Sequence, residues 1–120
     1  MSVTEYLEQA RHNREVADVL SQGSPVSLQW AVTCIFYTAL HYVNAYLLHH
    51  SQPTPSDHGA REHSVRRHMR AVYPAYRWLK TESERARYCL VRPTERVFER
   101  SRQKVGEIEQ FVNSHVSRVH

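Results

Sequence analysis

Three histidines and three arginines lie within one short segment of this chain, "PSDHGAREHSVRRH" at residues 55–68. Histidine changes charge near neutral pH and can transfer protons, and arginine offers phosphate a planar fork of N–H donors. Because RNA carries its own nucleophile, the 2′-hydroxyl, these two side-chain types suffice for cleavage without a metal ion. The segment is consistent with three alternatives: an RNA-cutting site, a metal site, or a basic helix face in solvent.

A helix is expected through this segment, and its turns sort the basic residues into two sets. The apolar direction is marked by Val65, Met69 and Val72. At ~100° per residue, His58, Arg61 and His68 lie within about 60° of that direction. The opposite, solvent-facing side carries His63, Arg66, Arg67 and Arg70.

The packing-side set contains the candidate catalytic residues. Arg61 and His68 are two helical turns apart on one face, so together they can hold a phosphate, with His58 as a helper. In that interpretation Arg61 neutralises the phosphoryl oxygens and His68 transfers a proton. The alternative is structural: Arg61 pairs with an acid on another helix, such as Glu82, and His68 sits at the edge of the bundle.

The solvent-facing arginines also have two interpretations. Arg66, Arg67 and Arg70 are expected to keep the helix soluble, and they are also candidates for binding RNA or another polyanion. The net charge of +4 and the isoelectric point near 9.3 permit such a partner without requiring one.

A metal site is not expected from the histidines of this segment. His58, His63 and His68 recur every five residues, but His63 points about 140° away from each neighbour, so the three do not converge on one ion. Carboxylates at ligand spacing are also missing from the segment. The sequence therefore predicts neither a metal nor another cofactor.

The rest of the chain has helical periodicity and predicts one all-α domain over residues 1–120, an up-and-down bundle of about five helices. The expected helices cover about Val3–Gln22, Ser27–His49, Ser56 or Asp57 to Val72, Pro74–Arg87, and Thr94 as N-cap to Val116. The second is apolar on nearly every side and is expected at the centre. Its polar stripe is Cys34, Tyr37, Thr38, His41 and Asn44.

Two further positions have alternatives at this stage. His41 is either a hydrogen-bonded core residue or a residue that faces the third helix at an interface. The apolar positions of the last helix, Phe98, Val105, Ile108, Val112 and Val119, keep a near-heptad spacing. This stripe packs either inside the bundle or against another subunit.

The composition excludes several protein classes. Cys34 and Cys89 have no CxxC spacing, which argues against a disulfide scaffold or zinc ribbon and favours a reducing cytoplasm. The N-terminal segment carries charges where a signal peptide has an apolar core. The apolar stretch from Leu28 to Leu48 contains polar side chains, so it is expected to be a buried core helix and not a membrane span.

The run "WAVTCIFYTALHYVNAYL", the proline-containing loop after it, "SDHGAREHSVRRH" and "AYRWLKTESERARY" resemble the HEPN family (higher eukaryotes and prokaryotes nucleotide-binding), in particular its small stand-alone members. The resemblance covers about residues 5–115. It implies a helical bundle with a four-helix core that forms a homodimer.

Many HEPN proteins are metal-independent endoribonucleases of toxin–antitoxin, phage-defence and CRISPR systems. Their motif is an arginine and a histidine separated by four to six residues, and two protomers combine their motifs at the dimer interface. In this sequence six residues separate Arg61 from His68. The resemblance implies that Arg61 binds the scissile phosphate, that His68 transfers a proton, and that the products carry a 2′,3′-cyclic phosphate and a 5′-hydroxyl.

Two features of the segment depart from the family pattern. Glu62, which follows the arginine, is acidic and can repel phosphate, and the motif opens the third helix instead of lying late in the bundle. Other stand-alone HEPN-like proteins lack the motif. The alternative function is therefore a non-catalytic module that binds nucleotide or RNA, or that serves as a partner subunit of an antitoxin or defence-system protein.

Overall fold

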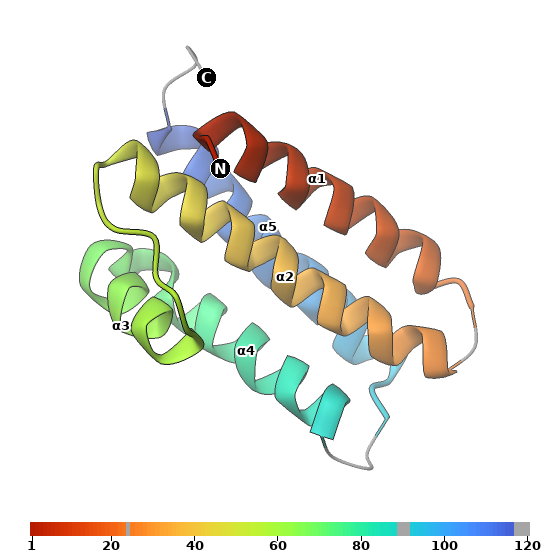
Figure 1. Ribbon diagram of the computed structural model, residues 1–120. Coiled ribbons are helices and arrows are strands. Elements are labelled where there is room, and N and C mark those ends of the chain that lie inside the picture. Colours follow the sequence, from red (N-terminus) through yellow and green to blue (C-terminus); the bar gives the residue numbers. More distant parts are fainter. Residues whose placement is uncertain (24, 89–91, 117–120) are drawn as a thin grey trace.

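The computed structural model describes residues 1–23, 25–88 and 92–116, and this part of the chain is an all-α helical bundle without strands (Figure 1). Its elements are α1 (Val3–Leu20), α2 (Pro25–His49), α3 (His58–His68), the 3₁₀ turn η1 (Arg70–Val72), α4 (Tyr73–Tyr88) and α5 (Glu95–His115). The predicted all-α bundle is confirmed. The four long helices run alternately up and down, and the short α3 packs beside α2 and α4.

Helix α2 is the centre of the bundle, as its apolar composition predicted. Residues from Leu28 to Leu47 supply the largest share of the buried side chains, and α1, α4 and α5 all pack on α2. Residues 27–49 are long and apolar enough to cross a membrane, but 78% of the tested window is buried inside the bundle. The predicted core helix is therefore what the structure contains.

A shared carboxylate joins three of the long helices. Glu109 of α5 accepts hydrogen bonds from Arg14 of α1, at 3.2 Å, and from the hydroxyl of Tyr42 of α2, at 2.9 Å. The apolar stripe of α5 faces inward beside this contact, with Ile108 and Val112 fully buried. The stripe thus packs inside the bundle as far as Val112, while Val119 lies outside the described residues.

Local sequence signals account for most helix ends. Ser2 and Glu5 form the predicted capping box of α1, and Thr94 caps α5 as predicted. Helix α2 begins at Pro25, two residues earlier than expected, because a proline in the first turn needs no N–H partner. Helix α1 ends at Leu20 and not at Gln22, because the N–H groups of Gln22 and Gly23 bond the carbonyls three positions back, and no longer those four positions back.

The third helix differs from the sequence prediction. It was expected to continue to Val72, but it ends at His68, and Met69 leaves the helical region at φ −133° and ψ 46°. In an uninterrupted helix the ring of Pro74 would clash with the carbonyl of Arg70. The break at Met69 lets α4 start afresh at Tyr73, with Pro74 in its first turn.

Helix α2 ends in a left-handed turn that directs the following loop. Ser51 has φ 58°, its N–H bonds the carbonyl of Leu48, and the N–H of Gln52 bonds the carbonyl of Leu47. These two bonds form a Schellman cap, a motif that normally places glycine at this position. The turn brings residues 52–55 back alongside α3.

The strained position gives a stability prediction. A side chain in the left-handed region costs about 1–2 kcal/mol relative to glycine, so Ser51→Gly should raise the free energy of unfolding by up to about 1 kcal/mol. Ser51→Val should lower it, because a β-branched side chain fits this region worst. Urea unfolding of the three proteins measures both changes. A glycine variant less stable than the wild type would contradict the left-handed turn at Ser51.

Candidate functional site

Helix α3 begins where the sequence predicted, at an aspartate cap. The carboxylate of Asp57 accepts a hydrogen bond of 2.7 Å from the N–H of Ala60, and Asp57 itself is extended. This is the usual arrangement of an N-cap, because it satisfies an N–H group that the first turn leaves unpaired. His58 therefore starts the helix, and Arg61 stands one turn later.

The side chain of Arg61 ties α3 to α2 and to the loop before α3. Its Nε donates to the amide oxygen of Asn44 at 3.3 Å, and a terminal nitrogen donates to the carbonyl of Pro55 at 3.0 Å. Its other terminal nitrogen lies 3.3 Å from Nδ1 of His58. With only 7% of its surface exposed, Arg61 is held within the chain by all three nitrogens.

The proposed acidic partner of Arg61 is not what the structure contains. Glu82 instead pairs with Arg85 at 3.2 Å, one turn away on α4. Among the described residues the contacts of Arg61 are an amide, a backbone carbonyl and an imidazole. The prediction missed Asn44 because residues 44 and 61 are brought together only by tertiary packing.

His58 is exposed, and its contact with Arg61 determines which ring nitrogen carries the proton. A guanidinium has only donors, so Nδ1 of His58 accepts and, in the neutral ring, Nε2 carries the proton. The pKa of His58 is lowered, first by partial burial and then by the positive charges of Arg61 and Arg87. His58 is thus a neutral hydrogen-bond donor whose free N–H points away from Arg61.

Two further polar groups lie near Arg61. His41 is half-buried, its Nδ1 has no hydrogen-bond partner, and its pKa is lowered by burial and then by the charge of Arg61. Tyr76 is fully buried, and burial raises its pKa to about 12 although the charge of Arg61 acts in the opposite direction. His41 is therefore not the hydrogen-bonded core residue of the first alternative, and its ring lies 6.1 Å from the ring of Tyr6 on α1.

The other side of α3 borders an open groove. Its volume is about 500 Å³, and the loop after α2 forms the opposite wall. The lining residues are Gln52, Pro53, Pro55, Ala60, His63, Ser64, Arg67 and His68. None of these residues is acidic, whereas two histidines, one arginine, one hydroxyl and one amide can donate hydrogen bonds to an anion.

The groove unites residues that the helical wheel had assigned to opposite sides. His63 and Arg67 were placed on the solvent-facing side and His68 on the packing side, yet all three line the groove. The wheel measures only the angle around one helix axis, and it omits the loop that closes the groove. His63 and His68 are five residues apart, about 7.5 Å along the axis.

Arg61 and His68 do not share a site within the described part of the chain. Arg61 packs toward α2 and does not line the groove, while His68 is half-exposed in the groove wall. The backbone carbonyl of His68 accepts a bond of 3.4 Å from the hydroxyl of Tyr46, which holds the end of α3 against α2. Of the solvent-facing arginines, Arg67 lines the groove, and Arg66 and Arg70 are exposed outside it.

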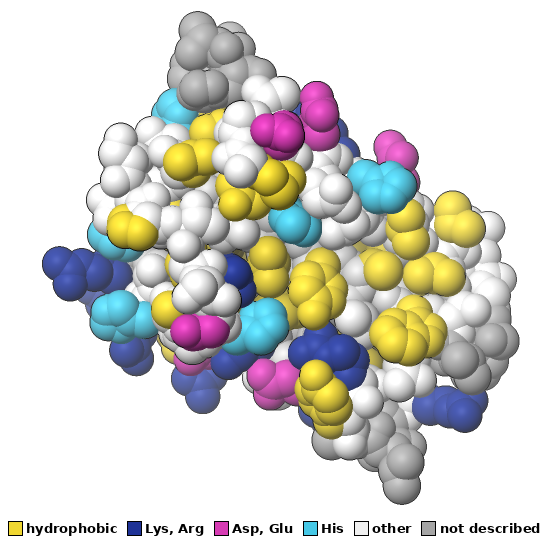
Figure 2. Space-filling view, viewed as in Figure 1, with side chains coloured by type: hydrophobic (Ala, Val, Ile, Leu, Met, Phe, Trp, Pro, Cys, Tyr) yellow, Lys and Arg dark blue, Asp and Glu magenta, His cyan; other side chains and the backbone are white. Residues whose placement is uncertain are grey.

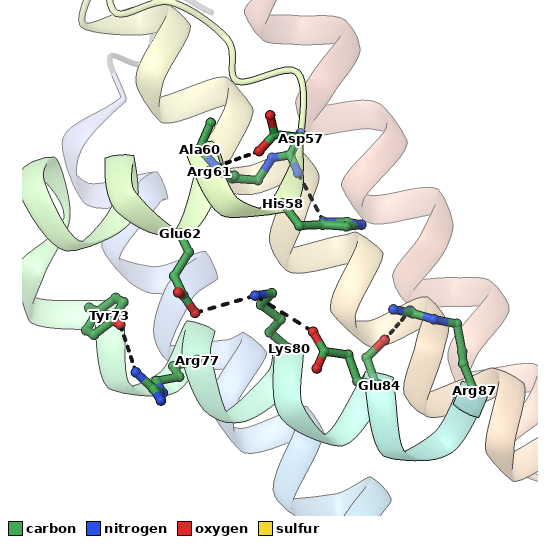
Figure 3. A network of polar contacts seen from close by, with 11 residues as sticks. Asp57, His58, Ala60, Arg61, Glu62, Tyr73, Arg77, Lys80, Glu84 and Arg87 are labelled. Carbon is green, nitrogen blue, oxygen red and sulfur yellow. Dashed lines mark hydrogen bonds and ion pairs between the residues drawn. The ribbon is translucent and has the colours of Figure 1, made fainter. Parts of the chain in front are cut away.

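Glu62, the acidic residue that follows Arg61, forms an ion pair with another helix. Glu62 pairs with Lys80 of α4 at 3.6 Å, and Lys80 also pairs with Glu84 at 3.7 Å (Figure 3). Its negative charge is therefore partly neutralised at the junction of α3 and α4. Within the described ranges no three histidine, cysteine, aspartate or glutamate side chains lie close enough to hold a metal ion.

Comparison with protein families, with curated proteins and with solved structures finds no match to this chain. The sequence did not indicate Gln52 and the two prolines as groove residues, because loops carry no periodic signal. Ser64 was also missed, although the helical spacing of Ala60, His63, Ser64 and Arg67 is a signal by which this face of α3 could have been found.

The contacts of Arg61 predict that its substitution lowers the free energy of unfolding, whereas substitution of the exposed Arg66 does not. Arg61→Ala leaves Asn44 and the carbonyl of Pro55 without their donors and should lower the free energy of unfolding by about 3 kcal/mol. Arg66→Ala, an exposed arginine of the same helix, should change it by less than about 0.5 kcal/mol. Urea unfolding compares the two variants. Equal effects would show that Arg61 does not anchor α3.

The lowered pKa of His41 predicts how the free energy of unfolding depends on pH. An imidazole whose pKa in the folded protein lies below its unfolded value stabilises the fold above about pH 6.5, and this contribution is lost as the pH falls. His41→Gln should therefore lose less free energy of unfolding than the wild type between about pH 7.5 and about pH 5.5. His12→Gln, on the exposed side of α1, serves as control. If His41→Gln loses as much free energy of unfolding on acidification as the wild type, the lowered pKa of His41 in the folded protein is contradicted.

Proposed function

We propose that this chain is a metal-independent endoribonuclease of the HEPN type, and that it cleaves RNA in the groove between α3 and the loop after α2. The observation that carries the proposal is the lining: His63, His68 and Arg67 border one groove that contains no carboxylate. The resemblance of "WAVTCIFYTALHYVNAYL" and "SDHGAREHSVRRH" to that family supports the same activity.

The lining residues provide each group that the reaction needs. One histidine takes the proton of the 2′-hydroxyl, whose oxygen attacks the phosphorus, and the other donates a proton to the departing 5′-oxygen. A new O2′–P bond forms while the P–O5′ bond breaks, which leaves a 2′,3′-cyclic phosphate and a 5′-hydroxyl. Arg67 neutralises the charge that develops on the phosphoryl oxygens. Ser64 and Gln52 add neutral donors for binding.

In this proposal Arg61 is a positioning residue and not the ligand of the phosphate. Its three nitrogens hold Pro55, His58 and Asn44, and Pro55 is part of the groove wall. The family motif assigns phosphate binding to the arginine at this position. The single chain instead offers Arg67 in the groove, and a homodimer, which the resemblance implies, could bring further side chains to it.

The second candidate function is a non-catalytic module that binds RNA or nucleotide. The full engagement of Arg61 within its own chain favours it, because the arginine of the family motif is then not free for chemistry. Such a module would use the same groove and the same cations. As a ribonuclease or as a binding subunit, we place the chain in a toxin–antitoxin or phage-defence system, with an antitoxin or defence protein as partner.

Cleavage of labelled RNA in EDTA tests the proposal. General acid and base groups each contribute about 10²–10⁴-fold to a rate, so His63→Asn and His68→Asn should each reduce cleavage at least about a hundredfold. Arg67→Gln should reduce it similarly. His12→Asn on α1 changes an exposed histidine outside the groove and should leave the rate unchanged.

Three outcomes are informative. Cleavage to cyclic-phosphate ends that is lost in the groove variants supports the ribonuclease. RNA binding without cleavage, weakened by Arg67→Gln, supports the binding module instead. Cleavage that survives all three substitutions would place the active site elsewhere and contradict the proposal.

A further inference from the structure

The exposed face of α2 carries an unusual set of side chains on the side seen in Figure 2. Hydrophobic side chains are exposed along the middle of this face, with arginine or lysine and histidine side chains among them. Trp30, Tyr37 and His41 follow one another at helical spacing on α2, and each is at least partly exposed. They form a strip that none of the described helices covers completely.

Two of the most exposed large hydrophobic side chains in the described protein belong to neighbouring helix ends, Trp30 to the start of α2 and Tyr88 to the end of α4. Trp30 is 53% exposed and Tyr88 is 77% exposed. The side-chain amide of Gln29, next to Trp30, donates to the backbone carbonyl of Ala86, two residues before Tyr88. This bond fixes the end of α4 beside the start of α2, so both aromatic rings belong to the same corner of the molecule.

Arg87 lies between the aromatic side chains of this corner. Its guanidinium carbon is 5.9 Å from the centre of the Tyr37 ring and 5.1 Å from that of Tyr88. These distances fall within the range of a cation–π interaction. We call Trp30, Tyr37, Arg87 and Tyr88 the aromatic patch.

The charge at the aromatic patch is positive. Lys80 and Arg85 of α4 each pair with carboxylates, but Arg87 forms no ion pair among the described residues. Its guanidinium donates to the hydroxyl of Ser83, and its Nε is buried without a hydrogen-bond partner, so a ligand could reach only the terminal nitrogens. The charge of Arg87 also reaches His58 and contributes to the lowering of its pKa. An anionic ligand with flat rings would satisfy both the charge and the exposed aromatic surface.

We propose that the aromatic patch binds single-stranded RNA by stacking bases on Trp30, Tyr37 and Tyr88 while Arg87 contacts a phosphate. This inference rests on the proposed function and names its substrate class. Stacking on aromatic rings requires unpaired bases, because a duplex keeps its base faces covered. The patch lies beside α3, since the charge of Arg87 acts on His58, the first residue of the helix that also lines the groove.

A non-cleavable probe separates this inference from the ribonuclease activity. A labelled single-stranded 2′-O-methyl oligonucleotide lacks the nucleophile, so its binding does not depend on catalysis. Stacking of one base contributes about 1–3 kcal/mol, which corresponds to roughly tenfold or more in affinity. Trp30→Ala and Tyr88→Ala should each weaken binding of this probe about tenfold. Val19→Ala, which removes an equally exposed side chain from α1, should not.

Tryptophan fluorescence gives a second measurement that does not rely on loss of affinity. The chain contains two tryptophans, so Trp78→Phe leaves Trp30 as the single reporter. Stacking of a base on Trp30 should quench its emission when the single strand is added, and a blunt duplex of the same sequence should not.

Each contrary result would overturn the inference. Failure of the wild type to bind the single strand, equal binding by all variants, or quenching by duplex alone would each do so. If Trp30→Ala and Tyr88→Ala instead dissociate a dimer without changing RNA affinity, the patch belongs to a second copy of the chain. Failure of the wild type to bind the single strand would contradict the groove as an RNA site as well. The ribonuclease would survive the other results, because its test depends on the groove variants. Cleavage that survives substitution of the groove residues would contradict the ribonuclease and leave the stacking result intact.

Discussion

The buried guanidinium of Arg61 is the interaction on which the arrangement of the site depends. A buried charge without a carboxylate is tolerated only when hydrogen bonds replace its hydration. Asn44, His58 and the carbonyl of Pro55 provide these bonds from α2, α3 and the intervening loop. Because one side chain satisfies all three, α3 and the loop are held at a fixed distance from each other. The groove between them is the space that this distance leaves.

The hydrogen bonds of Arg61 also orient α3, so that its two sides carry different kinds of side chain. Its inner side holds Arg61 and Val65 in the packed interior, while its outer side presents His63, Ser64 and Arg67 to the groove. The acidic residue of the helix, Glu62, is directed to Lys80 of α4. Carboxylates are thereby kept out of the groove lining, and the remaining donors all favour an anion.

Local signals predicted the fold well, whereas the site depended on contacts that the sequence does not encode locally. The caps at Ser2, Asp57 and Thr94 and the apolar surface of α2 need only neighbouring residues to be recognised. Pro74, whose ring excludes a continuous helix, indicated that α3 and α4 are separate helices but not that α3 ends as early as His68. Two features of the site could not be predicted from neighbouring residues. The bond between Arg61 and Asn44 spans seventeen residues, and the groove that His63 and His68 both line depends on a loop that a helical wheel omits.

The most direct test of the account is the position of RNA on the protein, measured from the side-chain NMR signals of the histidines. The chain contains nine histidines, among them His63 and His68 in the groove and His12 on α1, so their imidazole resonances report on the groove and on a surface away from it. Addition of a single-stranded 2′-O-methyl oligonucleotide should shift the signals of His63 and His68 first and most. The signal of His12, on the exposed side of α1, should stay in place. Shifts confined to other histidines, with His63 and His68 unchanged, would contradict the assignment of the groove as the RNA site.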